Sequence, residues 1–175
     1  AVGTEDKLRI YPDFTNLLDG VVPESFDPAV HGVCLVPNAR MLDMTDTMQS
    51  SAYLPFMIRC AEHLRRRGAR PFVLIHETRS DGQLAAEIAN AAGGIPVLAE
   101  ADPLCIKGIL GASQATLGSR YHGLVSALSQ GVPSLALGWS HKYAQLLADY
   151  ERPGDMVSMR AATGVIEDRI DGLLD

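Results

Sequence analysis

The six residues Gly118-Ser119-Arg120-Tyr121-His122-Gly123 place an arginine and a histidine where a strand is expected to meet a helix. Before them, 115–117 is typical of a short buried strand; behind them, Leu124, Val125 and Leu128 recur at helical spacing. The first turn of a helix has free backbone N–H groups and a partial positive charge. With Arg120 and His122 added, such a turn can bind a phosphate or a carboxylate.

The same stretch is also compatible with an ordinary capped helix. Ser119 would then be the N-cap, and the side chains of Arg120 and His122 would extend into solvent. Tyr121 would pack rather than react, and the small Gly123 would let the helix approach the sheet closely. Helix starts that bind anions are common, so this stretch alone leaves both interpretations open.

Short apolar runs alternate with helical patterns along the rest of the chain. Strands are predicted at 33–36, 72–75, 95–98, 115–117 and 134–137, with short apolar runs also at 8–11 and 156–158. Helices are predicted at 48–67, 80–92, 102–110, 120–129, 140–150 and 160–174. Asp102-Pro103 is a typical N-cap and N1 pair, Gly68 a typical helix end, and Ser140 a candidate N-cap.

Continuous apolar strands that alternate with helices indicate a mostly parallel sheet covered on both faces. The 175 residues are enough for one such domain with a full core. We therefore expect an α/β, Rossmann-like parallel sheet with helices on both faces. Residues 14–18 are predicted to form a turn or short helix, and 21–30, with two prolines and no period, a connector.

Polar residues follow each predicted strand, and in an open α/β sheet ligands bind beyond the carboxyl ends of the strands. That edge gathers several cations and three of the five histidines although the net charge is -6, which favours a small anionic ligand. The residues concerned are Asn38, Arg40, His76, Glu77, Arg79, Glu100, Ser119, Arg120, His122, Gly138, Ser140, His141 and Lys142.

Several of these residues have a simpler explanation. Arg40 is equally compatible with a surface arginine, and His76 with a strand-end histidine that bonds a loop carbonyl. Asp81 is most simply a first-turn carboxylate that complements a helix dipole. Lys142 lies in a first helical turn, where a cation is mildly unfavourable, so a ligand role gains some weight.

Composition and charge argue against several classes of protein. The basic run Arg65-Arg66-Arg67 ends a predicted helix, where cations suit the dipole, so no nucleic-acid surface is expected. The sequence has an odd number of cysteines, and all three lie in apolar settings: Cys34, Cys60 and Cys105. This pattern favours reduced thiols and a cytoplasmic location. No zinc spacing, signal peptide or membrane-spanning apolar segment is present in the sequence.

Together, three of these motifs resemble those of a known family. Arg120-Tyr121-His122 at a helix start, then Gly131-Val132-Pro133 before a strand, then Lys142 after it, resemble the C-terminal half of the polysaccharide pyruvyl transferase family. The resemblance extends over roughly residues 8–150. Asp81 and Arg40 fall where the family has an aspartate and an arginine after its strands, and Pro12-Asp13-Phe14 is similar to the crossover from the preceding domain.

The resemblance implies a fold and an activity. The family has two Rossmann-like domains arranged as in GT-B glycosyltransferases, and it transfers pyruvate from phosphoenolpyruvate to a sugar of a cell-surface glycan, usually as a cyclic ketal. Residues 31–175 would be the C-terminal, donor-binding domain, and 1–30 the connector from an N-terminal domain. The start at Ala1, without an initiator methionine, is compatible with a processed terminus or with a piece of a longer protein; the resemblance favours the second.

The resemblance also assigns roles. Arg120 and Arg40 would clamp the anion, His122 would act as general acid or base or stabilise the leaving phosphate, and Lys142 would add charge or orient its loop. No cofactor and no metal is required, and the acceptor would be a glycan or lipid-linked saccharide, through which peripheral membrane contact could arise. Further donor-site residues would be Ser119, Tyr121, Gly123, His76 and Ser140.

Two other functions stay open. In a GT-B glycosyltransferase or nucleotide-sugar enzyme, the same helix start would receive a diphosphate and an acid such as Glu100 would bind a ribose. In a non-catalytic binding module, the fold would persist without the reaction. The retained Arg120, His122 and Lys142 argue against that second alternative.

Overall fold

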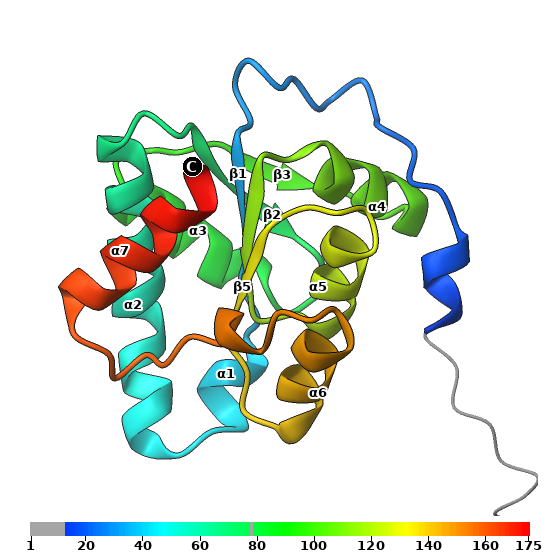
Figure 1. Cartoon of the computed structure of the whole chain (residues 1–175). Coiled ribbons are helices and arrows are strands. Elements are labelled where there is room, and N and C mark those ends of the chain that lie inside the picture. Colours follow the sequence, from blue (N-terminus) through cyan, green and yellow to red (C-terminus); the bar gives the residue numbers. More distant parts are fainter. Residues whose placement is uncertain (1–12, 78) are drawn as a thin grey trace, which may run out of the picture.

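The computed structural model describes residues 13–77 and 79–175, and it places them around a five-stranded, all-parallel sheet (Figure 1). The strand order is β3-β2-β1-β4-β5, so the chain builds outward from β1 first to one side and then to the other. The predicted α/β, Rossmann-like class is confirmed. The strands are β1 (Val33–Val36), β2 (Pro71–Ile75), β3 (Val97–Ala99), β4 (Ala115–Gly118) and β5 (Ser134–Ala136).

Helices cover both faces of the sheet. In Figure 1, α2, α3 and α7 lie on one side of the strands, and α4 and α5 lie on the other, with α6 against α5. The helices are α1 (Arg40–Asp43), α2 (Thr47–Arg66), α3 (Gly82–Ala91), α4 (Pro103–Ala112), α5 (Tyr121–Leu128), α6 (His141–Asp149) and α7 (Thr163–Leu174), with 3₁₀ turns at Phe14–Leu17 and Pro153–Asp155.

The central position of β1 in the sheet explains why its four residues are all apolar and do not alternate with polar ones. Val33 and Leu35 pack in the cluster that includes α2, α3 and α7, whereas Cys34 and Val36 pack in the cluster that includes α4. Successive strand side chains point to opposite faces, so a strand covered on both faces needs four apolar residues in a row. All four are buried.

Local signals account for several helix ends. Asp102 accepts hydrogen bonds from the N–H groups of Leu104 (2.7 Å) and Cys105 (3.3 Å), so its predicted N-cap role is confirmed. Gly68 has φ 70° directly after α2, where the left-handed conformation favours glycine. Ser140 is at the predicted N-cap position of α6, although its side chain makes no cap bond, whereas the N-cap of α5 is Arg120 and not Ser119.

Other boundaries also differ from prediction. The third strand is 97–99, because Pro96 lacks an N–H and contributes only its carbonyl, which accepts from the Val73 N–H at 2.9 Å. The run at 156–158 forms only an isolated parallel bridge between Met156 and Ala136. The single-turn helix α1 was not predicted, since four residues are too few to show a period. The run predicted at 8–11 lies outside the described residues.

Residues 13–30, the described part of the connector, run along α4. The Val21 N–H donates to the Leu104 carbonyl at 2.9 Å, and Lys107 Nζ donates to the Thr15 carbonyl at 2.6 Å. A Cβ placed on Gly108 would meet the backbone of Val21, so the two segments approach more closely than a side chain would allow. The connector is therefore packed on the domain as part of one body.

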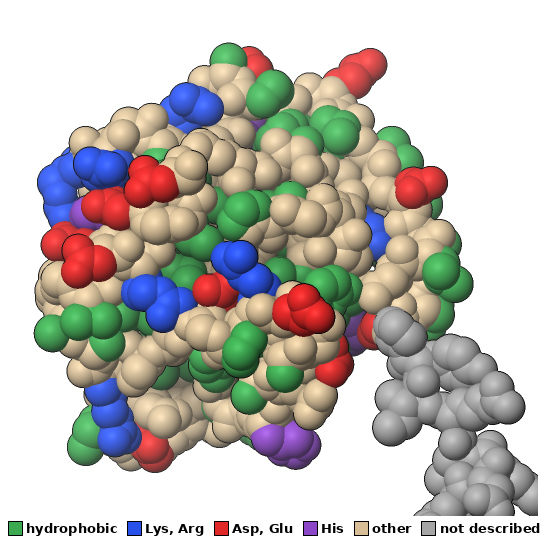
Figure 2. Space-filling view, in the orientation of Figure 1, with side chains coloured by type: hydrophobic (Ala, Val, Ile, Leu, Met, Phe, Trp, Pro, Cys, Tyr) green, Lys and Arg blue, Asp and Glu red, His purple; other side chains and the backbone are tan. Residues whose placement is uncertain are grey.

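The surface carries both signs of charge. Figure 2 shows acidic and basic side chains interspersed over the visible face, without a large patch of one sign. Over residues 13–77 and 79–175, none of the helices is both long enough and apolar enough to cross a bilayer.

The contact between the connector and α4 is open to a direct test. Gly108→Ala should lower the free energy of unfolding by about 1–3 kcal/mol, since the added methyl overpacks against the Val21 backbone. Gly172→Ala is the control: its Cβ would meet nothing within 4 Å, and alanine favours a helix over glycine by up to about 1 kcal/mol. Urea denaturation measures both; equal stability of the two variants would contradict the close approach.

Candidate functional site

The sheet order places the candidate site at the carboxyl ends of β1 and β4. The register pairs Val36, the last residue of β1, with Gly118, the last residue of β4. The chain then leaves β1 toward α1 and α2 on one face and leaves β4 toward α5 on the other face. Strands that diverge in this way open a crevice between their loops, which is the usual ligand site of open α/β sheets.

A cavity of about 310 Å³ lies in this crevice. Six of the nine predicted site residues line it, from the loops after β1, β2, β4 and β5: Arg40, His76, Arg120, Tyr121, His122 and Lys142. The structure therefore brings the predicted cations and histidines together, and their binding of a ligand stays a prediction. The cavity is completed by Asn38, Glu77, Trp139 and Tyr143.

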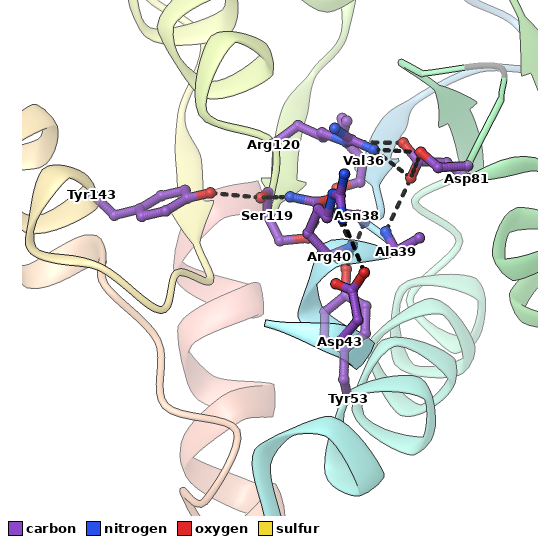
Figure 3. A network of polar contacts seen from close by, with 11 residues as sticks. Val36, Asn38, Ala39, Arg40, Asp43, Tyr53, Asp81, Ser119, Arg120 and Tyr143 are labelled. Atoms are coloured by element: carbon purple, nitrogen blue, oxygen red, sulfur yellow. Dashed lines mark hydrogen bonds and ion pairs between the residues drawn. The ribbon is translucent and has the colours of Figure 1, made fainter. Parts of the chain in front are cut away.

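Arg120 is held by a buried carboxylate. Its Nε donates to Asp81 Oδ2 at 2.9 Å and its Nη2 donates to Asp81 Oδ1 at 2.6 Å, while Nη2 also donates to the Ser80 hydroxyl at 2.9 Å (Figure 3). The Arg120 side chain is 19% exposed, so the guanidinium stays in reach of the cavity without entering the core. Two hydrogen bonds from a planar guanidinium to one carboxylate fix the orientation of the guanidinium and also pair the two charges.

The simpler interpretation of Asp81, a first-turn carboxylate on a helix dipole, fits its N-cap position at α3 but does not account for its contacts. Its side chain is 0% exposed and makes no cap bond to α3, although Asp81 is the residue that precedes that helix. Oδ1 accepts from the Ala39 N–H at 3.0 Å and from the Ser80 hydroxyl at 3.1 Å, in addition to Arg120. Local sequence could not show this, because the partners lie in three separate loops.

His122 lies at the open side of the cavity. It is in the first turn of α5, its side chain is 66% exposed, and its Nε2 is 3.8 Å from Asp13 Oδ2 of the connector. Hydrogen bonds from Thr15 lower the pKa of Asp13, and the nearby His122 lowers it further. The imidazole of His122 therefore lies beside a carboxylate and is accessible from solvent.

His76 occupies the inner side of the cavity. A Cβ placed on Gly123 would lie 3.5 Å from His76 Cδ2, so the imidazole packs directly over the start of α5. Burial lowers the pKa of His76 below its ordinary 6.5, and the charges of Arg120 and His122 lower it further. His76 is therefore a neutral imidazole near pH 7, able to accept a hydrogen bond or a proton. Gly123 does not line the cavity, and a Cβ there would make ordinary contacts of 3.4–3.5 Å with Val36, Arg120 and His76, so the space does not itself require the predicted small residue.

Lys142 is surrounded by aromatic rings. Its Nζ lies 4.8 Å from the ring centre of Tyr121, 5.5 Å from that of Tyr143 and 6.0 Å from that of Trp139. Ring faces attract an ammonium and orient it without neutralising its charge. Among residues 13–77 and 79–175, no carboxylate forms an ion pair with Lys142. Tyr121 thus both packs, as the simpler interpretation held, and supports a cavity cation.

Ser119 and Ser140 do not line the cavity. Ser119 is fully buried, its hydroxyl shares a hydrogen bond with the Tyr53 hydroxyl, and its carbonyl accepts from Asn38 Nδ2 and from the Tyr143 hydroxyl, each at 2.9 Å (Figure 3). These bonds fix the backbone just before Arg120. The Ser140 hydroxyl is buried without a hydrogen-bond partner in the described ranges.

Arg40 lines the cavity with a side chain that is mostly exposed. Its guanidinium pairs with Asp43 at 3.0 Å, and both side chains are mostly exposed (Figure 3). Exposed ion pairs contribute little, so Arg40 can exchange Asp43 for a ligand at small cost. Both interpretations of Arg40, surface residue and ligand, therefore stand.

Sequence reasoning missed the aromatic wall of the cavity. Trp139 follows β5 and Tyr143 lies one turn into α6, so the rule that found Lys142 also points to them. The sequence gives no reason to assign them to a site, because an aromatic side chain alone carries no charge and usually packs in the core. Their function here depends on the ammonium that they surround.

The lowered pKa of His76 predicts a pH dependence of stability. The unfolded chain binds a proton at His76 near pH 6.5, whereas the folded chain binds it only at lower pH, so stability falls as the pH drops from about 7.5 to 5.5. His76→Gln should flatten this part of the curve of unfolding free energy against pH. His141→Gln, at an exposed histidine of α6, is the control and should keep the slope; a wild-type slope in His76→Gln would refute the prediction.

Comparison with known proteins identifies the family of the chain. A family model described as polysaccharide pyruvyl transferase matches residues 2–141, which include all five strands and the site residues up to the start of α6. Comparisons with curated proteins and with solved structures give no match. The family model extends over well more than half of the 175 residues, and it confirms the resemblance based on Arg120, His122 and the Gly-x-Pro turn. The chain belongs to the polysaccharide pyruvyl transferase family, a family of transferase enzymes.

Proposed function

We propose that this chain is the donor-binding domain of an enzyme that transfers the pyruvyl group of phosphoenolpyruvate to a sugar of a cell-surface polysaccharide, forming a ketal. The observation that carries the proposal is the gathering of Arg40, Arg120, His122 and Lys142 around one cavity in a member of this family. In this proposal residues 31–175 form the donor domain, and 1–30 lead from a preceding domain that receives the acceptor.

The cavity suits a compact anion with two charged groups. The N–H groups of residues 121–123 in the first turn of α5 have no acceptor in the described part of the chain, so they are free for a ligand oxygen. Lys142 and Arg40 add positive charge from other sides, partly offset by the carboxylate of Glu77. A phosphate at the helix start beside Lys142 and a carboxylate at Arg40 would satisfy both groups of phosphoenolpyruvate.

The residues present can carry the proton transfers of ketal formation. His122 would protonate the methylene carbon while the first sugar hydroxyl bonds to the neighbouring carbon and gives its proton to a base, for which the neutral His76 is placed. The second hydroxyl would then displace phosphate, which takes that hydroxyl's proton and leaves as hydrogen phosphate. The proton on the base returns to the acid, so no net proton is consumed. Arg120 and Lys142 would bear the charge that develops on the leaving phosphate.

The partners follow from this proposal. The acceptor would be a glycan or a lipid-linked saccharide, and contact with a membrane would come through that acceptor. The scheme uses no cofactor and no metal, and it fits a cytoplasmic enzyme supplied with phosphoenolpyruvate. These points stay predictions.

The nucleotide-sugar alternative has less support. It requires an acid such as Glu100 to bind a ribose, but Glu100 accepts hydrogen bonds from the N–H groups of Ala101 (2.7 Å) and Asp102 (3.0 Å) and does not line the cavity. Family membership also favours pyruvyl transfer over glycosyl transfer.

Ligand binding by the chain itself tests the donor. Phosphoenolpyruvate at about 100 times its Kd should stabilise the fold by about 2.7 kcal/mol, seen as a higher Tm, whereas UDP- and CMP-sugars should leave Tm unchanged. Lys142→Ala should weaken the effect of phosphoenolpyruvate at least tenfold in Kd. Arg59→Ala, at an exposed arginine of α2 outside the cavity, should not. Stabilisation by the nucleotide sugars alone would reverse the assignment.

Turnover tests the role of His122. In the complete enzyme, His122→Ala should lower kcat for phosphate release from phosphoenolpyruvate by about 10²–10⁴-fold, the usual contribution of a positioned acid or base. His141→Ala should retain wild-type kcat, because His141 does not line the cavity. A loss below about tenfold for His122→Ala would remove His122 from that role.

A further inference from the structure

The Asp81 carboxylate accepts hydrogen bonds from groups in three loops at the carboxyl edge of the sheet. Its two oxygens accept from four donors: Arg120 Nε, Arg120 Nη2, the Ala39 N–H and the Ser80 hydroxyl, at 2.6–3.1 Å (Figure 3). A carboxylate that is 0% exposed keeps its charge only with partners of this kind. Asp81 is therefore a buried carboxylate that links several segments through its hydrogen bonds.

The donors belong to three loops that leave neighbouring strands. Ala39 follows β1, Ser80 lies between β2 and α3, and Arg120 lies between β4 and α5. Since β1 lies between β2 and β4, the Asp81 carboxylate ties together the loops on both sides of the central strand. It does so at the carboxyl edge, where the cavity opens.

The two usual structural roles do not account for this arrangement. Asp81 does not cap α3 through its side chain, so helix capping gives no reason for a buried carboxylate. A buried ion pair is also a poor source of stability, because desolvation offsets most of the Coulomb attraction. The pair does impose one orientation on the guanidinium.

Both ends of Arg120 are held. The preceding residue, Ser119, is fixed through its carbonyl by Asn38 and Tyr143 and through its N–H by the Val36 carbonyl at 3.0 Å. The guanidinium is fixed by Asp81 along its Nε and Nη2 edge, which leaves Nη1 without a partner in the described part of the chain. Arg120 therefore has only Nη1 to offer a ligand without giving up a hydrogen bond to Asp81 or Ser80.

We propose that Asp81 is a positioning residue of the donor site, which presents Arg120 and the Arg40-bearing loop to phosphoenolpyruvate as one preorganised clamp. This inference rests on the proposed function. Asp81 also neutralises the charge of Arg120, so the unpaired positive charge of the cavity comes from Lys142 and from the groups at its open side. Removing the carboxylate would free Arg120 to move while making the cavity more positive.

A more mobile Arg120 in a more positive cavity should lower kcat without weakening the binding of phosphoenolpyruvate. Asp81→Asn keeps an oxygen for the Ala39 N–H but loses the ionic partner of Arg120. In the complete enzyme, we expect kcat for phosphate release to fall at least tenfold, while KM for phosphoenolpyruvate stays within threefold or decreases. A wild-type kcat, or a rise of KM alone, would overturn the proposal.

A double-mutant cycle shows whether Asp81 acts through Arg120. Arg120→Gln should lower kcat by itself, and adding Asp81→Asn to Arg120→Gln should lower it no further. Additive losses would mean that Asp81 acts independently of Arg120, which would overturn the proposal. Should Asp81→Asn fail to fold, Ser80→Ala takes its place in the cycle, because it removes one hydrogen bond to Nη2 at an exposed residue. The expected loss is then a few-fold in kcat, again absent in the Arg120→Gln background.

A separate measurement distinguishes failure of this inference from failure of the proposed function. In the chain alone, solvent exchange of the Arg120 Nε–H, assigned by Arg120→Lys and followed by NMR, should be slow in the wild type and at least tenfold faster in Asp81→Asn. Equal exchange rates in the wild type and in Asp81→Asn would refute the inference that Asp81 holds Arg120, whatever the activity of the complete enzyme. If exchange responds as expected but the complete wild-type enzyme releases no phosphate from phosphoenolpyruvate with any glycan acceptor, the proposed function fails and the donor-site role of Asp81 fails with it.

Discussion

The parallel pairing of β1 between β2 and β4 is the constraint on which the site depends. Three parallel neighbours end at one edge, so the loops that follow them meet there, although they lie about 40 residues apart along the chain. The register places Val36 beside Gly118, which brings the start of α5 against the loop of Asn38. Without this order, Arg120 and Asp81 would have no reason to meet.

The cations of the cavity are held in three physically different ways. Arg120 is neutralised and oriented by a buried carboxylate, Lys142 is oriented by ring faces that leave its charge intact, and Arg40 is held only by an exposed partner. A compact anion would thus meet one rigid cation, one semi-rigid cation and one adaptable cation. In the proposed reaction, this difference in rigidity would let the site hold the donor and still release phosphate.

The two histidines of the cavity differ for reasons of burial. His76 lies against Gly123 with its pKa lowered, whereas His122 is exposed beside the Asp13 carboxylate. The neutral His76 can accept a proton, whereas His122 is accessible to a ligand from the solvent side. The connector has a part in this difference, since Asp13 belongs to it, and this gives its packing along α4 a consequence for the site.

By itself, the sequence determined the strands, the longer helices and the edge at which Arg40, His76, Arg120, His122 and Lys142 gather, because apolar runs and helical spacing are local signals and parallel strands share one carboxyl edge. It also carried the family motif. Only the tertiary structure decided that Asp81 is the buried partner of Arg120, that Ser119 supports the backbone from behind, and that rings surround Lys142. Those contacts join residues from separate loops, and side-chain partners across such separations depend on packing geometry, which no local pattern records.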